Sequence, residues 1–296
     1  MKELTKTGNF LGIDKQYSTY NDSDVVILSA PFEKTVSYGK GTKNGPKEIL
    51  KASHHVEFYD EELDKEFCFE KGICTLEPLK LDDLTPAKAL GTIQKSVSKL
   101  LDNNKFVVTL GGEHSISSAP IKAHHEKFTN LTILHIDAHS DLRDKYEGSK
   151  YSHASVMARV AEFTTNIVQV GIRAQCIEEA EFIREKEIET FYMRDIRSGK
   201  YGRFWHWRVL SRLGKNVYIT FDVDGFDPSV ISSTGTPEPG GLLWDETMNL
   251  IKLVGKRRNI VGFDVVELAP AKEDPSSNFT AAKLVYKMLN YAFQNK

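Results

Sequence analysis

Short apolar runs alternate with longer amphipathic segments along almost the whole chain. The apolar runs are rich in β-branched and aromatic residues, which is typical of strands buried on both faces of a parallel sheet. We expect these strands at residues 25–30, 106–110, 131–136, 167–171, 188–192, 217–221 and 260–265. The intervening segments predict helices at residues 46–57, 85–101, 116–128, 154–162, 176–186, 245–256 and 281–293. This alternation predicts an α/β fold with helices on both faces of a mainly parallel sheet.

The pattern contains no internal repeat, low-complexity segment or linker that would divide the chain. Its 296 residues, of which 40% are hydrophobic, are enough to bury a large core. We therefore expect a single domain spanning residues 1–296. Clusters of glycine and proline at residues 39–46, 235–241 and 270–275 are typical of loops, and we expect these loops around the mouth of a functional site.

The charge of the chain argues against nucleic-acid binding, because 39 basic and 41 acidic residues are mixed along the sequence and the formal net charge is -2. No apolar run approaches the ~20 residues of a membrane span, and the first residues lack the apolar segment of a signal peptide. We therefore expect a soluble protein with no membrane partner. Cys68, Cys74 and Cys176 are odd in number and form no C-x-x-C pair, which indicates reduced thiols and a cytoplasmic location.

Acidic and histidine residues gather in three places, each directly after one of the predicted strands. The carboxyl ends of the strands line one crevice of an open α/β sheet, so these clusters should converge there. Within the second and third clusters, a spacing of two residues places side chains on the same side of an extended backbone. The candidate residues are His114 after the second strand, Asp137, His139 and Asp141 after the third, and Asp222 and Asp224 after the sixth.

Four aspartates gathered in one buried place would repel one another and lose their hydration. Two divalent cations remove this difficulty. With a hydroxide between them, the site keeps a net negative charge that attracts a cationic substrate. A single aspartate in such a position could equally be a helix cap or a turn residue. The six residues together favour a metal centre.

The motifs around these clusters resemble those of the ureohydrolase family, which includes arginase and agmatinase. The matching stretches extend over nearly the whole chain, at residues 35–38, 41–46, 111–114, 137–141, 152–155, 222–228, 235–241 and 264–270. The resemblance implies a three-layer αβα sandwich around a doubly wound, mainly parallel sheet. It also implies two divalent metal ions. We expect Mn²⁺, because oxygen-rich coordination with one imidazole for each ion suits this metal.

By the same resemblance, one ion would be bound by His114, Asp137, Asp141 and Asp222, and the other by Asp137, His139, Asp222 and Asp224. Asp137 and Asp222 would then bridge the two ions. Glu113 stands beside a ligand in the sequence, yet the resemblance does not make it one.

Three residues receive catalytic or substrate-binding roles from the resemblance. His153 would relay protons between the site and solvent, where the alternative is an ordinary loop histidine. Glu267 would bind the planar guanidinium through paired hydrogen bonds, where the alternative is an exposed loop glutamate. Asp141, besides binding metal, would pass the proton of the hydroxide to the leaving amine.

These roles imply hydrolysis of a small cationic guanidino compound to urea and an amine, within the hydrolases of linear amidines. The loop at residues 142–151 resembles the agmatinase version, so we expect agmatine as substrate and putrescine as product, a step of polyamine biosynthesis. Residues 154–157 depart from many agmatinases, which leaves guanidinobutyrate, arginine and formiminoglutamate as alternatives. Arg143 could bind the carboxylate of guanidinobutyrate, and Lys145 would act in the same direction. Asp144, Glu147 and Asp274 at the mouth would instead favour the ammonium group of agmatine.

The resemblance also implies a homo-oligomer, either a trimer or a hexamer. Trp205, His206 and Trp207 could form a contact between subunits, but packing in the core explains them equally well. A catalytically silent relative that binds metal or a regulatory partner is a different class of function. The complete set of candidate ligands argues against it.

Overall fold

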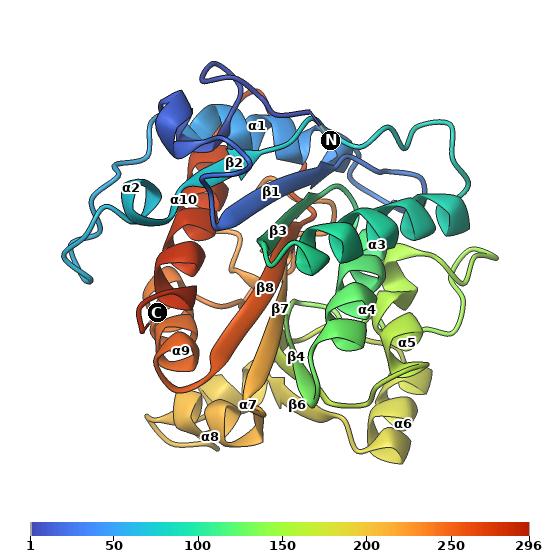
Figure 1. Ribbon diagram of the computed structural model, residues 1–296. Coiled ribbons are helices and arrows are strands. Elements are labelled where there is room, and N and C mark those ends of the chain that lie inside the picture. The colour runs from blue at the N-terminus through green and yellow to red at the C-terminus, as the bar shows by residue number, and fades with distance from the viewer. Residues whose placement is uncertain (1, 296) are drawn as a thin grey trace.

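The computed structural model describes residues 2–295, which contain one eight-stranded sheet with helices on both faces (Figure 1). The strands are β1 Val25–Ala30, β2 Ile73–Thr75, β3 Phe106–Gly111, β4 Leu131–Ile136, β5 Ile167–Ile172, β6 Glu189–Tyr192, β7 Asn216–Asp222 and β8 Asn259–Val266. Their order is β2-β1-β3-β8-β7-β4-β5-β6, and all neighbouring strands pair in parallel. The predicted α/β fold with a doubly wound parallel sheet is confirmed.

The helices form a layer on each face of the sheet (Figure 1). The first layer contains α1 Gly45–Ser53, α2 Phe67–Lys71, α7 Met193–Arg197, α8 Trp205–Arg212, α9 Trp244–Arg257 and α10 Pro275–Ala292. The second layer contains α3 Pro86–Asp102, α4 Ser118–Lys127, α5 Val156–Ala161 and α6 Ile177–Lys186. No helix among residues 2–295 is both long and apolar enough to cross a membrane.

The four central strands β3, β8, β7 and β4 are buried along nearly their whole length, which explains their continuous apolar sequences. The chain leaves β3 on one side of the β8–β7 pair and enters β4 on the other side. The winding of the sheet therefore changes direction at its centre. This is the place where open α/β sheets form their binding crevice.

Several elements differ from the prediction. The strand β2 and the short helices α2, α7 and α8 were not expected. Helix α10 begins at Pro275 rather than at residue 281, because Pro275 occupies its first turn and Asp274 accepts a hydrogen bond from the backbone nitrogen of Ser277. The helices expected at 116–128 and 154–162 each begin with a short 3-10 turn, η4 His114–Ser117 and η5 His153–Ser155.

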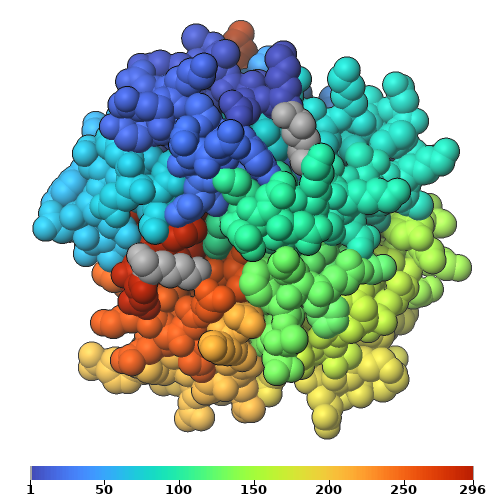
Figure 2. Space-filling view, viewed as in Figure 1, coloured from blue at the N-terminus to red at the C-terminus, as the bar shows by residue number. Residues whose placement is uncertain are grey.

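The C-terminal helix α10 is largely enclosed by an early part of the chain. Figure 2 shows the light-blue segment near residues 50–70 lying against the red C-terminal segment. Lys287 on α10 is buried, and its Nζ lies 3.0 Å from Asp60 Oδ2. Tyr286 donates a hydrogen bond to the carbonyl oxygen of Phe58. These contacts join residues 58–60 to the C-terminal helix on the face of the sheet that carries α1 and α10.

Candidate metal centre

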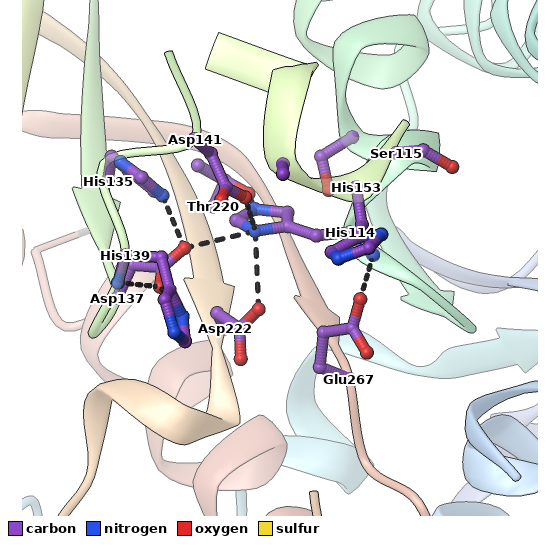
Figure 3. Close-up of polar contacts among 12 residues, drawn as sticks. His114, Ser115, His135, Asp137, His139, Asp141, His153, Thr220, Asp222 and Glu267 are labelled. Atoms are coloured by element: carbon purple, nitrogen blue, oxygen red, sulfur yellow. Dashed lines mark hydrogen bonds and ion pairs between the residues drawn. The ribbon is translucent and has the colours of Figure 1, made fainter. Parts of the chain in front are cut away.

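The four central strands end at the same crevice, and each end carries one polar side chain of the predicted site. His114 begins η4 after β3, Asp137 follows β4 directly, Asp222 ends β7, and Glu267 follows β8. Their side chains point toward one another (Figure 3). His114, Asp222 and Glu267 line a cavity of about 340 Å³ together with Asp141.

The turn between β3 and His114 requires glycine. A Cβ atom on Gly112 would lie 2.0 Å from the carbonyl oxygen of Phe32, which no side chain could tolerate. The backbone of Gly112 also accepts a hydrogen bond from the backbone nitrogen of Glu267 at 2.9 Å. This close packing of backbone against backbone brings His114 and Glu267 into the same crevice.

The first half of the centre surrounds the buried imidazole of His114. Its Nδ1 lies 3.0 Å from Asp137 Oδ2, 3.1 Å from Asp141 Oδ2 and 3.2 Å from Asp222 Oδ2. Its other ring nitrogen, Nε2, lies 3.0 Å from Thr220 Oγ1. Figure 3 shows dashed contacts between the imidazole and the surrounding carboxylates.

The hydrogen bonds of Thr220 decide which nitrogen of His114 carries the proton. Thr220 Oγ1 donates its only proton to Asp264 Oδ1 at 2.7 Å, so it can only accept a hydrogen bond from His114 Nε2. The neutral imidazole then has its lone pair on Nδ1, a buried atom that has no hydrogen-bond partner within residues 2–295. A lone pair that faces three carboxylate oxygens is repelled by them unless a cation lies between. The residues present therefore fit a metal ion.

The second half of the centre surrounds His139. Its Nδ1 lies 3.0 Å from Asp224 Oδ2 and 3.6 Å from Asp137 Oδ1. Three backbone amides hold these carboxylates: Asp137 Oδ1 accepts from His139 N, Asp224 Oδ1 from Ala138 N, and Asp222 Oδ1 from Asp224 N, at 2.6, 3.1 and 2.9 Å. Asp137 thus presents one oxygen to each half of the centre.

The protonation behaviour of the centre shows an excess of negative charge. Burial, followed by the charges of Asp224 and Asp137, raises the pKa of Asp222 well above its ordinary value. Burial alone would lower the pKa of His114, but the nearby carboxylates of Asp137, Asp141 and Asp222 raise it well above its ordinary value. Burial likewise opposes the charged form of His139, and the carboxylates of Asp224 and Asp137 raise its pKa. The polypeptide alone does not balance these carboxylates, which is the condition under which a divalent cation binds.

Two buried glutamates flank the centre and face different partners. Glu267 lines the cavity, and its Oε1 accepts a hydrogen bond from the backbone nitrogen of His114 at 2.5 Å. Burial raises the pKa of Glu267 well above its ordinary value. Glu113 instead turns toward a loop, where its Oε2 accepts hydrogen bonds from the backbone nitrogens of Lys34 and Thr35 at 2.6 and 2.7 Å. Its place agrees with its exclusion from the predicted ligands.

The loop that follows β4 carries His153 over the cavity. The backbone nitrogen of His153 donates a hydrogen bond to Thr35 Oγ1 at 3.0 Å, and its Nδ1 lies 3.3 Å from the same atom. Thr35 Oγ1 in turn donates to Glu113 Oε1 at 2.8 Å. The ring of Tyr146 packs edge-on against the imidazole, with 5.7 Å between the ring centroids. Thr35 thus joins two loops at the edge of the site. This role was not predicted from the sequence.

The mouth of the cavity differs from the prediction. Neither Asp144 nor Glu147 nor Asp274 lines the cavity. Asp144 Oδ1 accepts a hydrogen bond from Arg159 at 3.1 Å, and Asp274 caps α10. The expectation that these three carboxylates lie at the mouth was wrong, and Asp144 and Asp274 instead bind partners on α5 and α10.

Other charged residues occupy the mouth in their place. Glu238 and Glu179 line the cavity together with Arg143. Arg143 Nε lies 3.8 Å from Glu179 Oε2, and its guanidinium packs on the ring of Tyr146. Glu238 Oε1 lies 3.9 Å from His139 Nε2. The positive charge of Arg143 is therefore partly balanced, while Glu238 has, among residues 2–295, no basic side chain within ion-pair distance other than this imidazole.

One residue of the centre was missed altogether. His135 lies on β4, fully buried, and its Nε2 lies 2.7 Å from Asp137 Oδ2 (Figure 3). It belongs with His114, Asp137 and Asp141 to a group of side chains whose donor atoms are close enough to hold an ion. Its signal in the sequence is a polar residue inside an apolar strand, two positions before Asp137 and therefore on the same side of the backbone.

Known proteins place this chain in a family. The family model described as the arginase family matches residues 23–290. The chain belongs to the arginase family. The resemblance to agmatinase-like ureohydrolases is thereby confirmed, and with it the assignment as a hydrolase. The arginase-family match covers all four central strands and both halves of the candidate metal centre.

Relatives of the arginase family match the chain over nearly its whole length. The N(1)-aminopropylagmatine ureohydrolase of Synechocystis sp. is 39% identical, over 93% of this chain and 90% of the relative. The agmatinase of Bacillus anthracis is 34% identical, over 93% of this chain and 94% of the relative. The solved structure of the agmatine ureohydrolase of Thermoplasma volcanium superimposes with a TM-score of 0.85 at 28% identity, over 99% of this chain and 95% of that one.

Proposed function

We propose that the protein is a two-metal ureohydrolase that releases urea from agmatine or from an aminopropyl derivative of agmatine. The observation that carries this proposal is the buried lone pair of His114 Nδ1, which faces three carboxylate oxygens at the bottom of a cavity that also contains Glu267. The arrangement combines a cation-binding centre with a carboxylate suited to a guanidinium.

His114, Asp137, Asp141 and Asp222 would hold one ion, and Asp137, His139, Asp222 and Asp224 the other. One imidazole and several carboxylates for each ion suit Mn²⁺. Such a pair of ions lowers the pKa of a shared water until hydroxide is available near neutral pH. The bridging role of Asp137 is supported by its two oxygens, each of which faces a different half of the centre.

Glu267 would position the guanidinium. Its Oε1 is held by the backbone nitrogen of His114, so the carboxylate has a fixed orientation in the cavity. A carboxylate and a guanidinium form parallel hydrogen bonds, which fix the plane of the substrate as well as its position. Paired with a cation, Glu267 would be ionised despite the burial that raises its pKa.

Asp141 and His153 would move protons. Asp141 directs Oδ2 toward His114, so its other oxygen would carry a proton to the leaving amine. His153 lies on the loop above the cavity, and its Nδ1 is the ring nitrogen closer to Thr35 Oγ1. Since Thr35 gives its own proton to Glu113, His153 Nδ1 would carry the proton and Nε2 would accept protons from the site.

The far end of the substrate would be an amine. Glu238 at the mouth favours an ammonium group, and the pairing of Arg143 with Glu179 weakens its attraction for the carboxylate of guanidinobutyrate or arginine. Agmatine is the first candidate. N(1)-aminopropylagmatine is the second, because relatives from Synechocystis sp. and Thermus thermophilus that bear this activity in their names are 39% and 36% identical to this chain. We propose that the reaction is a step of polyamine biosynthesis.

Urea release tests this proposal directly. The Mn²⁺-loaded protein would be assayed for urea with agmatine, N(1)-aminopropylagmatine, guanidinobutyrate and arginine, and for formamide with formiminoglutamate, under otherwise identical conditions. We expect the highest kcat/KM for one of the two amines and the lowest for arginine. A protein that binds two ions yet releases neither urea from the four guanidino compounds nor formamide from formiminoglutamate would be a silent metal-binding relative, and the proposed activity would be rejected.

The setting of this activity is also part of the proposal. We propose one domain, a cytoplasmic location and a homo-oligomer, either a trimer or a hexamer. Three free cysteines in the described structure support a reducing compartment. Light scattering would measure the oligomeric state, and a monomer at micromolar concentration would reject it.

A further inference from the structure

A row of polar residues crosses the sheet directly below the candidate metal centre, and all of them are buried except Thr190, which is half-buried. The partners in register are Thr190 on β6, Gln169 on β5, His135 on β4, Thr220 on β7 and Asp264 on β8. Neighbours in register on parallel strands project their side chains to the same face of the sheet. We call these five residues the polar row. The four buried members Gln169, His135, Thr220 and Asp264 lie within largely apolar strands, where a polar group is costly unless it is satisfied.

Gln169 on β5 and Thr190 on β6 determine which ring nitrogen of His135 carries the proton. Gln169 Nε2 donates a hydrogen bond to the backbone carbonyl of Ser140 at 2.8 Å, which identifies this atom as the amide nitrogen. The same nitrogen lies 3.0 Å from His135 Nδ1, and an amide nitrogen can only donate. Thr190 Oγ1 donates to Gln169 Oε1 at 3.1 Å and supports this orientation. His135 Nδ1 is therefore the acceptor, and the proton of the neutral ring is on Nε2.

His135 Nε2 points at Asp137 Oδ2 over 2.7 Å, the shortest contact of that oxygen with an imidazole. Asp137 Oδ2 is also the oxygen that faces His114, while Oδ1 faces His139. We propose that His135 is a positioning residue: held in one tautomer by Gln169, it orients the carboxylate of Asp137 that the two ions would share. This inference rests on the proposed function only in taking Asp137 as a shared ligand.

The same hydrogen bonds explain why His135 is not itself a ligand. Both of its ring nitrogens are in use, Nδ1 as an acceptor from Gln169 and Nε2 as a donor to Asp137. A ligand nitrogen needs a free lone pair directed at the ion, as His114 Nδ1 has. Groups that hydrogen-bond to metal ligands commonly contribute 10–100-fold to metal affinity.

The test measures Mn²⁺ binding without substrate, by equilibrium dialysis and metal analysis of the full chain. His135→Leu removes the hydrogen bond to Asp137, and we expect its Kd for Mn²⁺ to rise by about 10–100-fold while two ions still bind at saturation. His135→Gln retains a side-chain N–H donor of similar reach, and we expect its Kd to stay within about threefold of the wild type. Gln169→Leu removes the hydrogen bond that holds His135 in one tautomer. We expect its Kd for Mn²⁺ to lie between those of the wild type and His135→Leu.

The matched control is His124→Leu, which removes another fully buried imidazole. His124 lies on α4, and its Nδ1 contacts the backbone carbonyl of Pro120 rather than a carboxylate of the metal centre. It should lower the thermal stability and leave the Kd for Mn²⁺ unchanged. Wild-type affinity in His135→Leu would overturn the proposal. So would an equal loss of affinity in His124→Leu, because the effect would then be general destabilisation. A fall from two ions to one at saturation would make His135 a direct ligand and would also overturn it.

The outcome is separable from that of the proposed function. A protein that binds two ions but releases no urea would reject the proposed function, while the ratio of Kd values between His135→Leu and the wild type would still decide the role of His135. Conversely, an active enzyme whose Kd is insensitive to His135 would keep the function and lose this inference.

Discussion

Replacement of Glu267 by glutamine is the most direct test of substrate orientation. The carboxylate of Glu267 is buried, and its Oε1 accepts the hydrogen bond from His114 N at 2.5 Å. A glutamine keeps this bond only if its carbonyl oxygen takes the place of Oε1. Its amide NH₂ must then replace Oε2. The substitution therefore removes a negative charge and presents N–H groups to a guanidinium that also carries only N–H groups.

The size of the effect follows from these two losses. A hydrogen bond to a charged group contributes about 1.5–3 kcal/mol, and a buried charge left without its partner costs about 2–5 kcal/mol. For Glu267→Gln in the partly open cavity, we expect a loss of about 3–4 kcal/mol in binding of the guanidinium in the transition state. At about 1.4 kcal/mol for each factor of ten, kcat/KM for agmatine should fall by about 10²–10³-fold.

The assay is urea release at saturating Mn²⁺, with metal content measured on the same samples. The matched control is Glu246→Gln, because Glu246 also binds a guanidinium, that of Arg197, through contacts of 2.7 and 2.9 Å, yet it does not line the cavity. Glu246→Gln should keep the kcat/KM of the wild type. If Glu267→Gln retains two ions and hydrolyses agmatine as fast as the control, Glu267 does not bind the guanidinium.

Three further substitutions test other parts of the structure. His153→Phe should keep both ions and lose about 10²-fold or more in kcat, with partial recovery on adding imidazole; a loss of metal in this variant would make His153 a ligand. Asp222→Ala should lose both ions in metal analysis, and full occupancy would contradict its bridging role. Burial lowers the pKa of His124 to about 4, whereas an unfolded histidine titrates near ~6.5. The unfolded chain therefore binds more protons between these values, so this contribution to stability is lost as the pH falls from about 6.5 to 4. Between these pH values, the free energy of unfolding of His124→Asn, measured by denaturant titration, should fall by up to roughly 3 kcal/mol less than that of the wild type. If it falls as steeply with pH as in the wild type, His124 is not the cause.

The apolar pattern predicted the strands of the sheet with ends that shift by at most one residue. Buried parallel strands are apolar on both faces, so their sequences carry a strong local signal. The strand β2 was missed because its three residues are too few to form a recognisable run. The helices α2, α7 and α8 were missed for a similar reason, since helices of one or two turns show little periodicity.

The loops at the mouth show the opposite case. Asp144, Glu147 and Asp274 were expected there on the basis of their position in the sequence alone. The structure turns Asp144 toward Arg159 and uses Asp274 as the cap of α10. Glu238 and Glu179 line the mouth instead. A side chain in a loop takes the direction that the nearest partner allows, and that partner is set by packing between distant segments.

The sequence by itself determined the fold class, because apolar strands alternate with amphipathic helices along the chain. It also determined the candidate ligands, because these residues stand at the carboxyl ends of apolar strands. Only the tertiary structure decided how those ligands are supported. His135 and Gln169 are 34 positions apart, and neither has a distinctive motif. The register between β4 and β5 makes them neighbours, and Ser140 fixes the amide between them. Hydrogen bonds across a sheet join residues by strand register rather than by sequence spacing, so the positioning of the ligands follows from the folded sheet alone.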